Sequence, residues 1–393
     1  MREAQLREAL LDARVPDAAG AKERGRRLVA AAYAASPPAL KTRRTRTRRA
    51  LQVALAAGLL AVAISPAGAA IGDWVGDAVD TGGMPARPAL TSLPAPGSLL
   101  VDSAKGPWVV GEDGGKRLLG DYRDSSWSPH GLYVAVAKEH ELAAVDPLGV
   151  ARWTLSRAGP VQMPAWSPDG ERIAYLSGGK IRLVAGNGTG DRLLDRGVAA
   201  VAPAWRWGAR RVLSYVTDGG RVRTLQTDSG RVLFEAAAPP GTRRLAWSAN
   251  GERLLIVGSS GVEALDRRGG RAWAVDAPAG FEVAASAIAP AGDRAATVLV
   301  SGSGSRSELA MLGPAGGGRT LFKGLGRFDG VTYSPDGEWL LLAWSSADEW
   351  LFLSPAHPRR VVAVADIAAQ FDPGTTSPPS FPSVAGWCCP PSG

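Results

Sequence analysis

Residues that could support acid–base, nucleophilic or metal chemistry are few in this chain of 393 residues, and they are dispersed. The three histidines, His130, His140 and His357, show no spacing typical of a metal-ligand set. The sequence contains no Gly-x-Ser-x-Gly nucleophile motif, no His-Glu-x-x-His motif, no phosphate-binding loop and no Cys-x-x-Cys pair. We therefore predict a protein that is not an enzyme, with no catalytic residue, no cofactor and no metal site.

The two cysteines are adjacent, at Cys388 and Cys389. In an oxidising compartment they can bond to each other or to a partner. A vicinal bridge needs a distorted peptide, because ordinary disulfides hold their Cα atoms about 4.4–6.8 Å apart. The alternative is a pair of small side chains packed near the end of the fold, and both interpretations stay open here.

Asp169 and Asp336 occupy the same place in a recurring turn signature, so their first interpretation is structural. Proline presets φ in this turn, aspartate bonds its own backbone, and glycine accepts a positive φ. His130 takes the aspartate position of another copy, which favours a turn role over a metal role. The signature occurs as Trp127-Ser-Pro-His-Gly131, Trp166-Ser-Pro-Asp169-Gly170, Trp247-Ser-Ala-Asn-Gly251 and Tyr333-Ser-Pro-Asp336-Gly337.

Two weaker copies, at Trp205 and Ile288, fill the gaps in this series. The steps between leading residues are then 39, 39, 42, 41 and 45. A period near 40 is typical of one four-stranded blade of a β-propeller. We expect each leading aromatic residue to be buried between blades. Among the tryptophans outside the leading position, we expect some of the following five to be exposed contacts: Trp108, Trp153, Trp207, Trp273 and Trp350.

The Trp-Ser-Pro-Asp-Gly motif resembles the repeat of the TolB-like propellers, a WD40-like family. The resemblance covers roughly Ser98 to the C-terminus. It implies an all-β propeller fold and says almost nothing about function.

The two ends of the repeat region predict how the ring closes. Ser98 to Asp121 holds three strand-like runs without a first strand, whereas Pro382 to Trp387 reads as a spare first strand. Pairing them makes a composite blade and removes both free sheet edges. We predict seven blades; a six-bladed ring is the alternative.

The net charge of +8 comes entirely from residues 1–49, because 50–393 are neutral overall, which argues against a nucleic-acid partner. Residues 50–71 carry no charge, and as a helix of about 33 Å they would cross a bilayer. Six cations directly before them orient the N-terminus toward the cytoplasm: Lys41, Arg43, Arg44, Arg46, Arg48 and Arg49.

These features predict four parts: a basic helical tail (1–49), a transmembrane helix (50–71), a Pro-rich extracytoplasmic linker (72–97) and the propeller (98–393). Within the tail, residues 3–14 and 18–35 read as helices. The alternative to a membrane anchor is an export signal cleaved near Ala69, which would release the protein from a bacterial-type membrane.

We therefore expect a membrane-anchored, extracytoplasmic module that binds a protein or ligand, or acts as a scaffold. One alternative is a transmembrane regulator whose tail binds a cytoplasmic partner of the sigma-factor class. The other is a propeller enzyme of the lactonase, lyase or glycosidase type. Such an enzyme would need carboxylates or histidines that converge on the mouth of the central channel.

Overall fold

The computed structural model describes residues 90–316, 318–357, 359–372 and 379–389. The tail, the uncharged segment 50–71 and residues 72–89 lie outside this range, so the predictions made for them remain predictions. In the described part of the chain, no helix has the length and apolar character needed to span a membrane.

The described residues form seven four-stranded antiparallel sheets, arranged as the blades of a β-propeller. We number the blades along the ring. Their strands are as follows: blade 1, β28 (Ser383–Cys388), β1 (Ser98–Ser103), β2 (Gly106–Val110) and β3 (Lys116–Leu118); blade 2, β4 (Asp124–Trp127), β5 (Val134–Lys138), β6 (Glu141–Val145) and β7 (Ala151–Ser156); blade 3, β8 (Val161–Trp166), β9 (Arg172–Ser177), β10 (Lys180–Ala185) and β11 (Arg192–Arg196).

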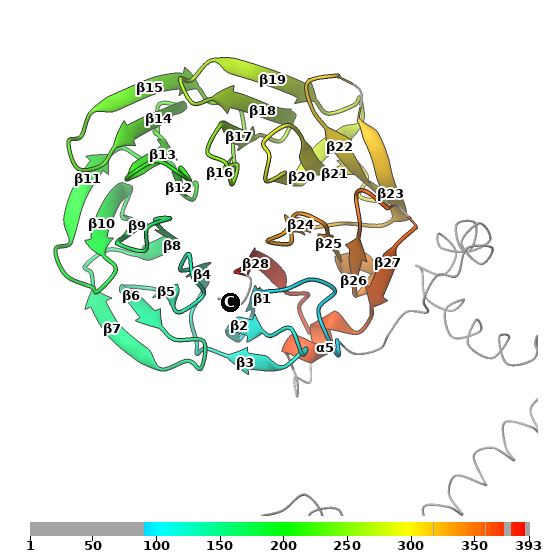
Figure 1. Ribbon diagram of the computed structural model, residues 1–393, viewed down its shortest axis with the longest axis horizontal. Helices are drawn as coiled ribbons and strands as arrows, with labels where there is room; N and C mark the ends of the chain where they lie inside the picture. Colours follow the sequence, from blue (N-terminus) through cyan, green and yellow to red (C-terminus); the bar gives the residue numbers. More distant parts are fainter. Residues whose placement is uncertain (1–89, 317, 358, 373–378, 390–393) are drawn as a thin grey trace, which may run out of the picture. The chain divides into compact units, whose positions relative to one another are not determined.

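The remaining blades repeat this order: blade 4, β12 (Ala204–Trp205), β13 (Val212–Val216), β14 (Arg221–Gln226) and β15 (Val232–Ala237); blade 5, β16 (Arg244–Trp247), β17 (Arg253–Val257), β18 (Gly261–Asp266) and β19 (Arg271–Asp276); blade 6, β20 (Phe281–Ile288), β21 (Ala295–Ser301), β22 (Arg306–Leu312) and β23 (Arg319–Leu325); blade 7, β24 (Gly330–Tyr333), β25 (Leu340–Trp344), β26 (Glu349–Leu353) and β27 (Val361–Val364). The first strand of each blade lies nearest the centre of the ring and the fourth lies outermost (Figure 1).

Blade 1 is the composite blade that closes the ring. Strand β28 pairs antiparallel with β1, and this pairing places Trp387 opposite Leu99. The prediction of seven blades with a C-terminal closing strand is therefore confirmed, and the six-bladed alternative is wrong. The weaker copies at Trp205 and Ile288 also end the first strand of complete blades.

The recurring turn has one hydrogen-bonding pattern in its four full copies. In blade 3, the N–H of Gly170 donates to the carbonyl oxygen of Ser167 at 2.9 Å, and the N–H of Arg172 donates to Ser167 Oγ at 2.9 Å. Gly170 has φ of 72°, which only glycine adopts without strain. Gly251 meets a second constraint, because a Cβ there would lie 2.0 Å from the carbonyl oxygen of Trp207 in blade 4. Turn chemistry and blade packing thus demand the same residue.

Two segments outside the blades complete the fold. Residues 90–97, which the sequence assigns to the linker, lie against the propeller with Leu90, Leu93 and Ala95 buried. After β27, the chain forms helix α5 (Ile367–Phe371). The helix forms because its apolar side chains are buried against blades 1 and 7: Phe371 packs on Trp350 with ring centroids 5.3 Å apart.

Candidate functional site

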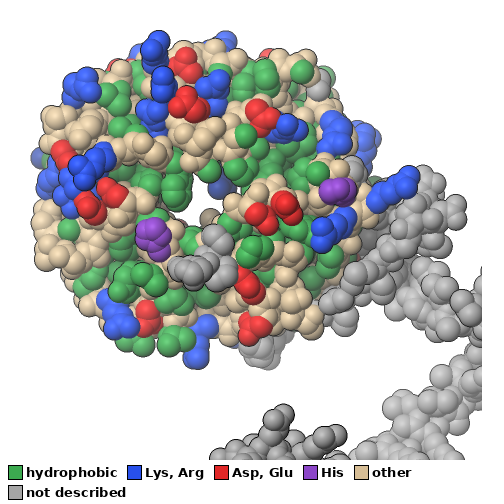
Figure 2. Space-filling view, viewed as in Figure 1, with side chains coloured by type: hydrophobic (Ala, Val, Ile, Leu, Met, Phe, Trp, Pro, Cys, Tyr) green, Lys and Arg blue, Asp and Glu red, His purple; other side chains and the backbone are tan. Residues whose placement is uncertain are grey.

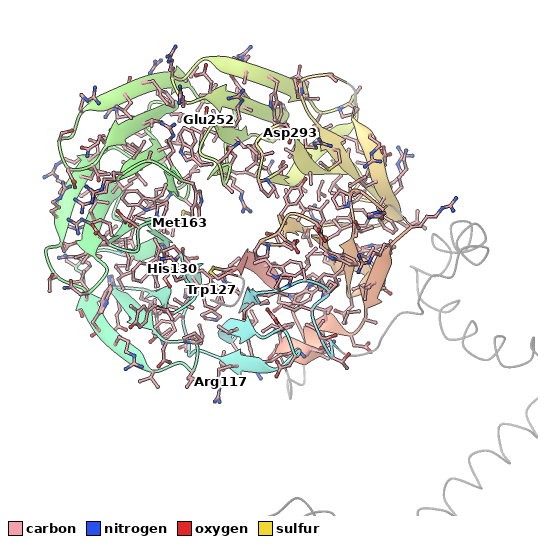
Figure 3. The ribbon with its side chains drawn as sticks, in the orientation of Figure 1. Arg117, Trp127, His130, Met163, Glu252 and Asp293 are labelled. Carbon is pink, nitrogen blue, oxygen red and sulfur yellow. A yellow bond between two sulfur atoms is a disulfide. The ribbon has the colours of Figure 1, made fainter. Side chains whose placement is uncertain are left out.

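The ring has two different faces, because all first strands run in the same direction. Each first strand ends at its glycine turn, so these turns share one face, which we call the turn face. The first strands begin on the opposite face, which we call the start face. His130, labelled in Figure 3, belongs to the turn face, and Figure 2 shows that side chains leave an opening at the centre of the ring.

A hollow of about 300 Å³ lies at the start-face end of the central channel, where the first strands of blades 5, 6, 7 and 1 begin. Both cationic and apolar side chains line it. The lining residues include Arg243, Arg244, Ala284, Ala285, Phe381 and Pro382. A hollow of this size accommodates a small ligand or a few residues of an extended peptide.

Two arginines give the hollow a positive charge. Within the described residues, neither the Arg243 nor the Arg244 guanidinium has an ion-pair or hydrogen-bond partner. Asp329, which also lines the hollow, is already bonded to Arg327 Nε at 2.6 Å. Sequence reasoning missed this pair; the available signal was two consecutive arginines at the start of a first strand in an otherwise neutral propeller.

An acidic pair lies at the same end of the channel. Asp102 of β1 stands opposite Ser383, which lines the hollow. Ser125 Oγ donates to Asp102 Oδ1 at 2.6 Å, and Asp124 accepts the Met163 N–H at 2.9 Å. Burial, together with the nearby Asp124 charge, raises the pKa of Asp102 to about 7 despite the hydrogen bond from Ser125. Asp102 therefore changes protonation near neutral pH.

A second carboxyl group with a raised pKa lies in blade 7. Glu349 is buried at the start of β26, and within the described residues its Oε2 has no hydrogen-bond partner. Burial, followed by the charges of Asp348 and Asp366, raises its pKa to about 7. This group couples the stability of the blade to pH.

The three histidines do not converge. His130 and His357 lie in loops of the turn face, whereas His140 lies in the β5–β6 turn on the start face. Within the part of the chain that the structure describes, no cluster of three or more histidine, cysteine, aspartate and glutamate residues is placed to hold a metal ion. Asp169 and Asp336 each accept the backbone N–H two residues ahead, at 3.0 Å, and so shape their turns.

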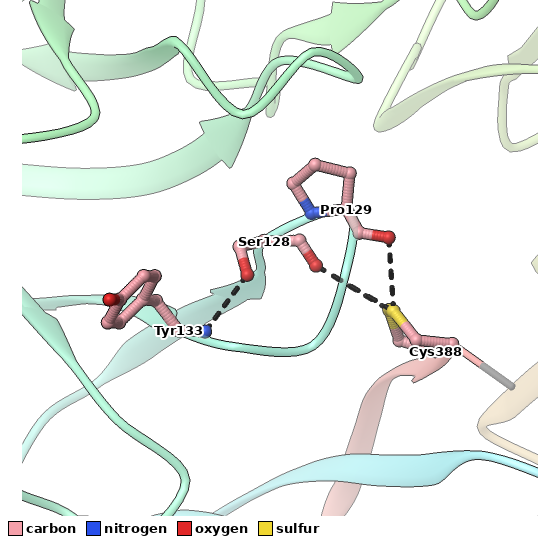
Figure 4. Close-up of a disulfide and its surroundings, with 5 residues drawn as sticks. Ser128, Pro129, Tyr133 and Cys388 are labelled. Atoms are coloured by element: carbon pink, nitrogen blue, oxygen red, sulfur yellow. Dashed lines mark hydrogen bonds between the residues drawn. A yellow bond between two sulfur atoms is a disulfide. The ribbon is translucent and has the colours of Figure 1, made fainter. Parts of the chain in front are cut away.

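Cys388 and Cys389 form a disulfide with each other at the turn-face end of β28 (Figure 4). The Cys388 sulfur lies 3.6 Å from the carbonyl oxygen of Ser128, and the Cys389 sulfur lies 3.3 Å from that of Pro129. The bridge therefore contacts the signature turn of blade 2, next to the seam where the ring closes.

The leading aromatic residues pack against the preceding blade. Trp166, Trp205, Trp247 and Trp387 are buried, whereas Trp127 and Tyr333 are half-buried. Of the five tryptophans among which we expected exposed contacts, one is exposed. Trp273 and Trp350 are buried and Trp108 and Trp153 are half-buried, which leaves Trp207, with 42% of its surface exposed, as the exposed member of this group.

Apolar side chains are also exposed on the turn face of blade 2. Leu132 and Tyr133 follow the signature turn, and Leu148 and Val150 belong to the neighbouring β6–β7 loop. Leu148 is the most exposed, at 66%. This group adds a second surface suited to contact with another molecule.

Comparisons with known proteins identify the fold and go no further. No protein-family model matches the sequence, and no curated protein matches it. Among solved structures, the β-propeller domain of Myceliophteria thermophila Cps50 (Swd1) is similar, with a TM-score of 0.52 and 13% sequence identity. The match covers 69% of this chain and 97% of that domain. At this identity, the similarity shows a shared propeller fold.

Proposed function

We propose that this chain is a membrane-anchored, extracytoplasmic propeller of the TolB-like type that binds a protein or peptide partner without catalysing a reaction. The observation that carries the proposal is the hollow at the start-face end of the channel. It combines a rigid frame of four blades with apolar walls and two arginines that have no partner among the described residues. A preformed site with a few convergent polar groups is typical of ligand recognition.

The membrane placement rests on the sequence. The 22 uncharged residues 50–71 follow six cations, which favours a single span with the propeller outside the cytoplasm. N-terminal sequencing of the protein from its native membrane tests this placement. A mature N-terminus at Ala70 would show that the segment is a cleaved export signal and not an anchor.

Binding is tested by cross-linking in intact cells, followed by purification of the full chain and identification of attached proteins. We expect a reproducible partner whose recovery falls when the hollow is blocked, for example by Ala285→Trp. The proposal would be contradicted if no protein were recovered in larger amount than with a control propeller of unrelated sequence. The partner's own cross-linked residues would show which face it contacts.

A propeller enzyme is the second candidate, because Asp102 and Asp124 lie at the channel mouth and the pKa of Asp102 is raised to about 7. A carboxyl group of this kind can act as a general acid. Assays with lactone and glycoside substrates test this candidate. Turnover that Asp102→Asn abolishes without loss of folding would favour the enzyme over the binding module.

A further inference from the structure

The position of Arg244 directs its side chain to the hollow. It is the first residue of β16, where Leu245 and Trp247 are buried in the core shared with blade 4. Side chains alternate along a strand, so Arg244 and Ala246 lie on the other side, toward blade 6. Blade 6 presents only small side chains there, including Ala284 and Ala285, which leave space beside the guanidinium.

Arg244 is both accessible and surrounded by protein. Its side chain is exposed to solvent, yet the surrounding atoms lower its pKa by removing part of its hydration. Both properties are expected for a side chain inside a channel mouth that water enters. A guanidinium that has lost hydration without gaining a counter-charge favours an incoming anion.

Several other arginines of the ring have a carboxylate partner. Arg223 bonds Asp195 at 2.6 Å, and Arg271 bonds Glu263 at 2.8 Å in the same blade as Arg244. Arg243 and Arg244 are adjacent and have no such partner among the described residues, so the positive charge at the hollow is not neutralised locally.

The rest of the lining favours a peptide over a free ion. Phe381 and Pro382 add apolar surface beside the arginines. The first strands are also the inner edges of their sheets, and such edges present backbone groups to an extended chain. A carboxylate flanked by apolar groups on an extended backbone matches this combination.

We propose that the hollow binds a carboxylate carried by an extended peptide segment, with Arg243 and Arg244 holding the carboxylate and Phe381 and Pro382 contacting the adjacent apolar side chain. This inference rests on the proposed function as a peptide-binding or protein-binding module and names its ligand chemistry. The carboxylate comes either from an acidic side chain or from a peptide C-terminus.

Fluorescence anisotropy with labelled hexapeptides separates these sources. One peptide carries two glutamates and an amidated C-terminus, the second replaces glutamate by glutamine, and the third is the glutamine peptide with a free C-terminus. We expect the full chain to bind the first or the third peptide at least tenfold more tightly than the second. Equal binding of all three would overturn the inference.

Three variants locate the site. Arg244→Gln is expected to weaken binding of the preferred peptide at least tenfold, and Ala285→Glu to do the same by placing a carboxylate beside the arginines. The control is Arg268→Gln, since Arg268 is exposed in the β18–β19 turn on the turn face of the same blade. Thermal unfolding shows that each variant is folded, and unchanged peptide affinity in a folded Ala285→Glu protein would refute the site.

The outcomes also separate this inference from the proposed function. Peptides that bind with no preference for a carboxylate and no dependence on Arg244 would refute the inference and leave a peptide-binding module. If inorganic phosphate displaced the labelled peptide as effectively as the unlabelled preferred peptide does, the hollow would be a general anion site and peptide recognition would be refuted. Absence of binding by any peptide, together with no cross-linked partner in cells, would refute both.

Discussion

Replacing Trp387 by alanine tests whether β28 holds the ring closed. Trp387 is 8% exposed and meets Phe352 of blade 7 edge-on, with ring centroids 5.7 Å apart. Truncating a buried tryptophan to alanine typically lowers the free energy of unfolding by about 3–5 kcal/mol. The Trp387 indole N–H is buried without a hydrogen-bond partner among the described residues, so the variant loses no hydrogen bond. We therefore expect the lower end, about 3 kcal/mol.

The matched controls use the same residue type. Trp207→Ala removes an indole that is 42% exposed on the turn face, and it should cost less than about 1 kcal/mol. Trp387→Phe keeps most of the buried area and removes the unpartnered N–H, so its effect should also be small. The three proteins thus separate loss of the closing contact from loss of a tryptophan.

Denaturant titration monitored by circular dichroism gives the unfolding midpoints, with a refolding limb to establish reversibility. A loss of about 3 kcal/mol would also lower the thermal midpoint by roughly 5–10 °C in a domain of this size. If Trp387→Ala unfolded at the same midpoint as Trp207→Ala, the closing strand would contribute no stability, and the role assigned to the composite blade would be wrong.

Three further predictions concern the packing, the buried carboxyl and the cysteines. Trp166→Ala should cost about 3–5 kcal/mol of unfolding free energy, because the ring is buried between blades 2 and 3, and any loss of ligand binding should track that loss of folding in the same titration. Because burial raises the pKa of Glu349 from 4.5 to about 7, folding favours its protonated form, and stability is lost as the pH rises from 4.5 through 7. The change in unfolding free energy caused by Glu349→Gln should therefore be more favourable at pH 8 than at pH 5. The difference between the two pH values should be at most about 3 kcal/mol, and partial access of water to the carboxyl group reduces it. An equal effect of the substitution at both pH values would contradict the assignment. Cys388 and Cys389 should resist alkylation until a reductant is added, as intact mass measurement would show, and modification without reductant would contradict the bridge.

The propeller itself could be predicted from the sequence because its determinants are local and repeated. The signature turn is closed by the same hydrogen bond, from the glycine N–H to the serine carbonyl oxygen, in each of its four full copies, and the spacing near 40 residues sets one blade per repeat. Ring closure could also be predicted from the sequence. The segment from Ser98 to Asp121 has three strands and lacks a first strand, and Pro382 to Trp387 supplies a spare one, so pairing them removes two free sheet edges.

Only the tertiary structure decided which side chains meet at the channel. Arg243 and Arg244 look like any surface arginines in the sequence, and their lack of a partner depends on what blades 6, 7 and 1 place beside them. The burial of Trp350 depends likewise on α5, which packs across a blade boundary, and the raised pKa of Asp102 depends on β4 lying beside β1. Local turn chemistry determines the repeat, whereas burial and charge at the candidate site arise from contacts between residues far apart in the chain.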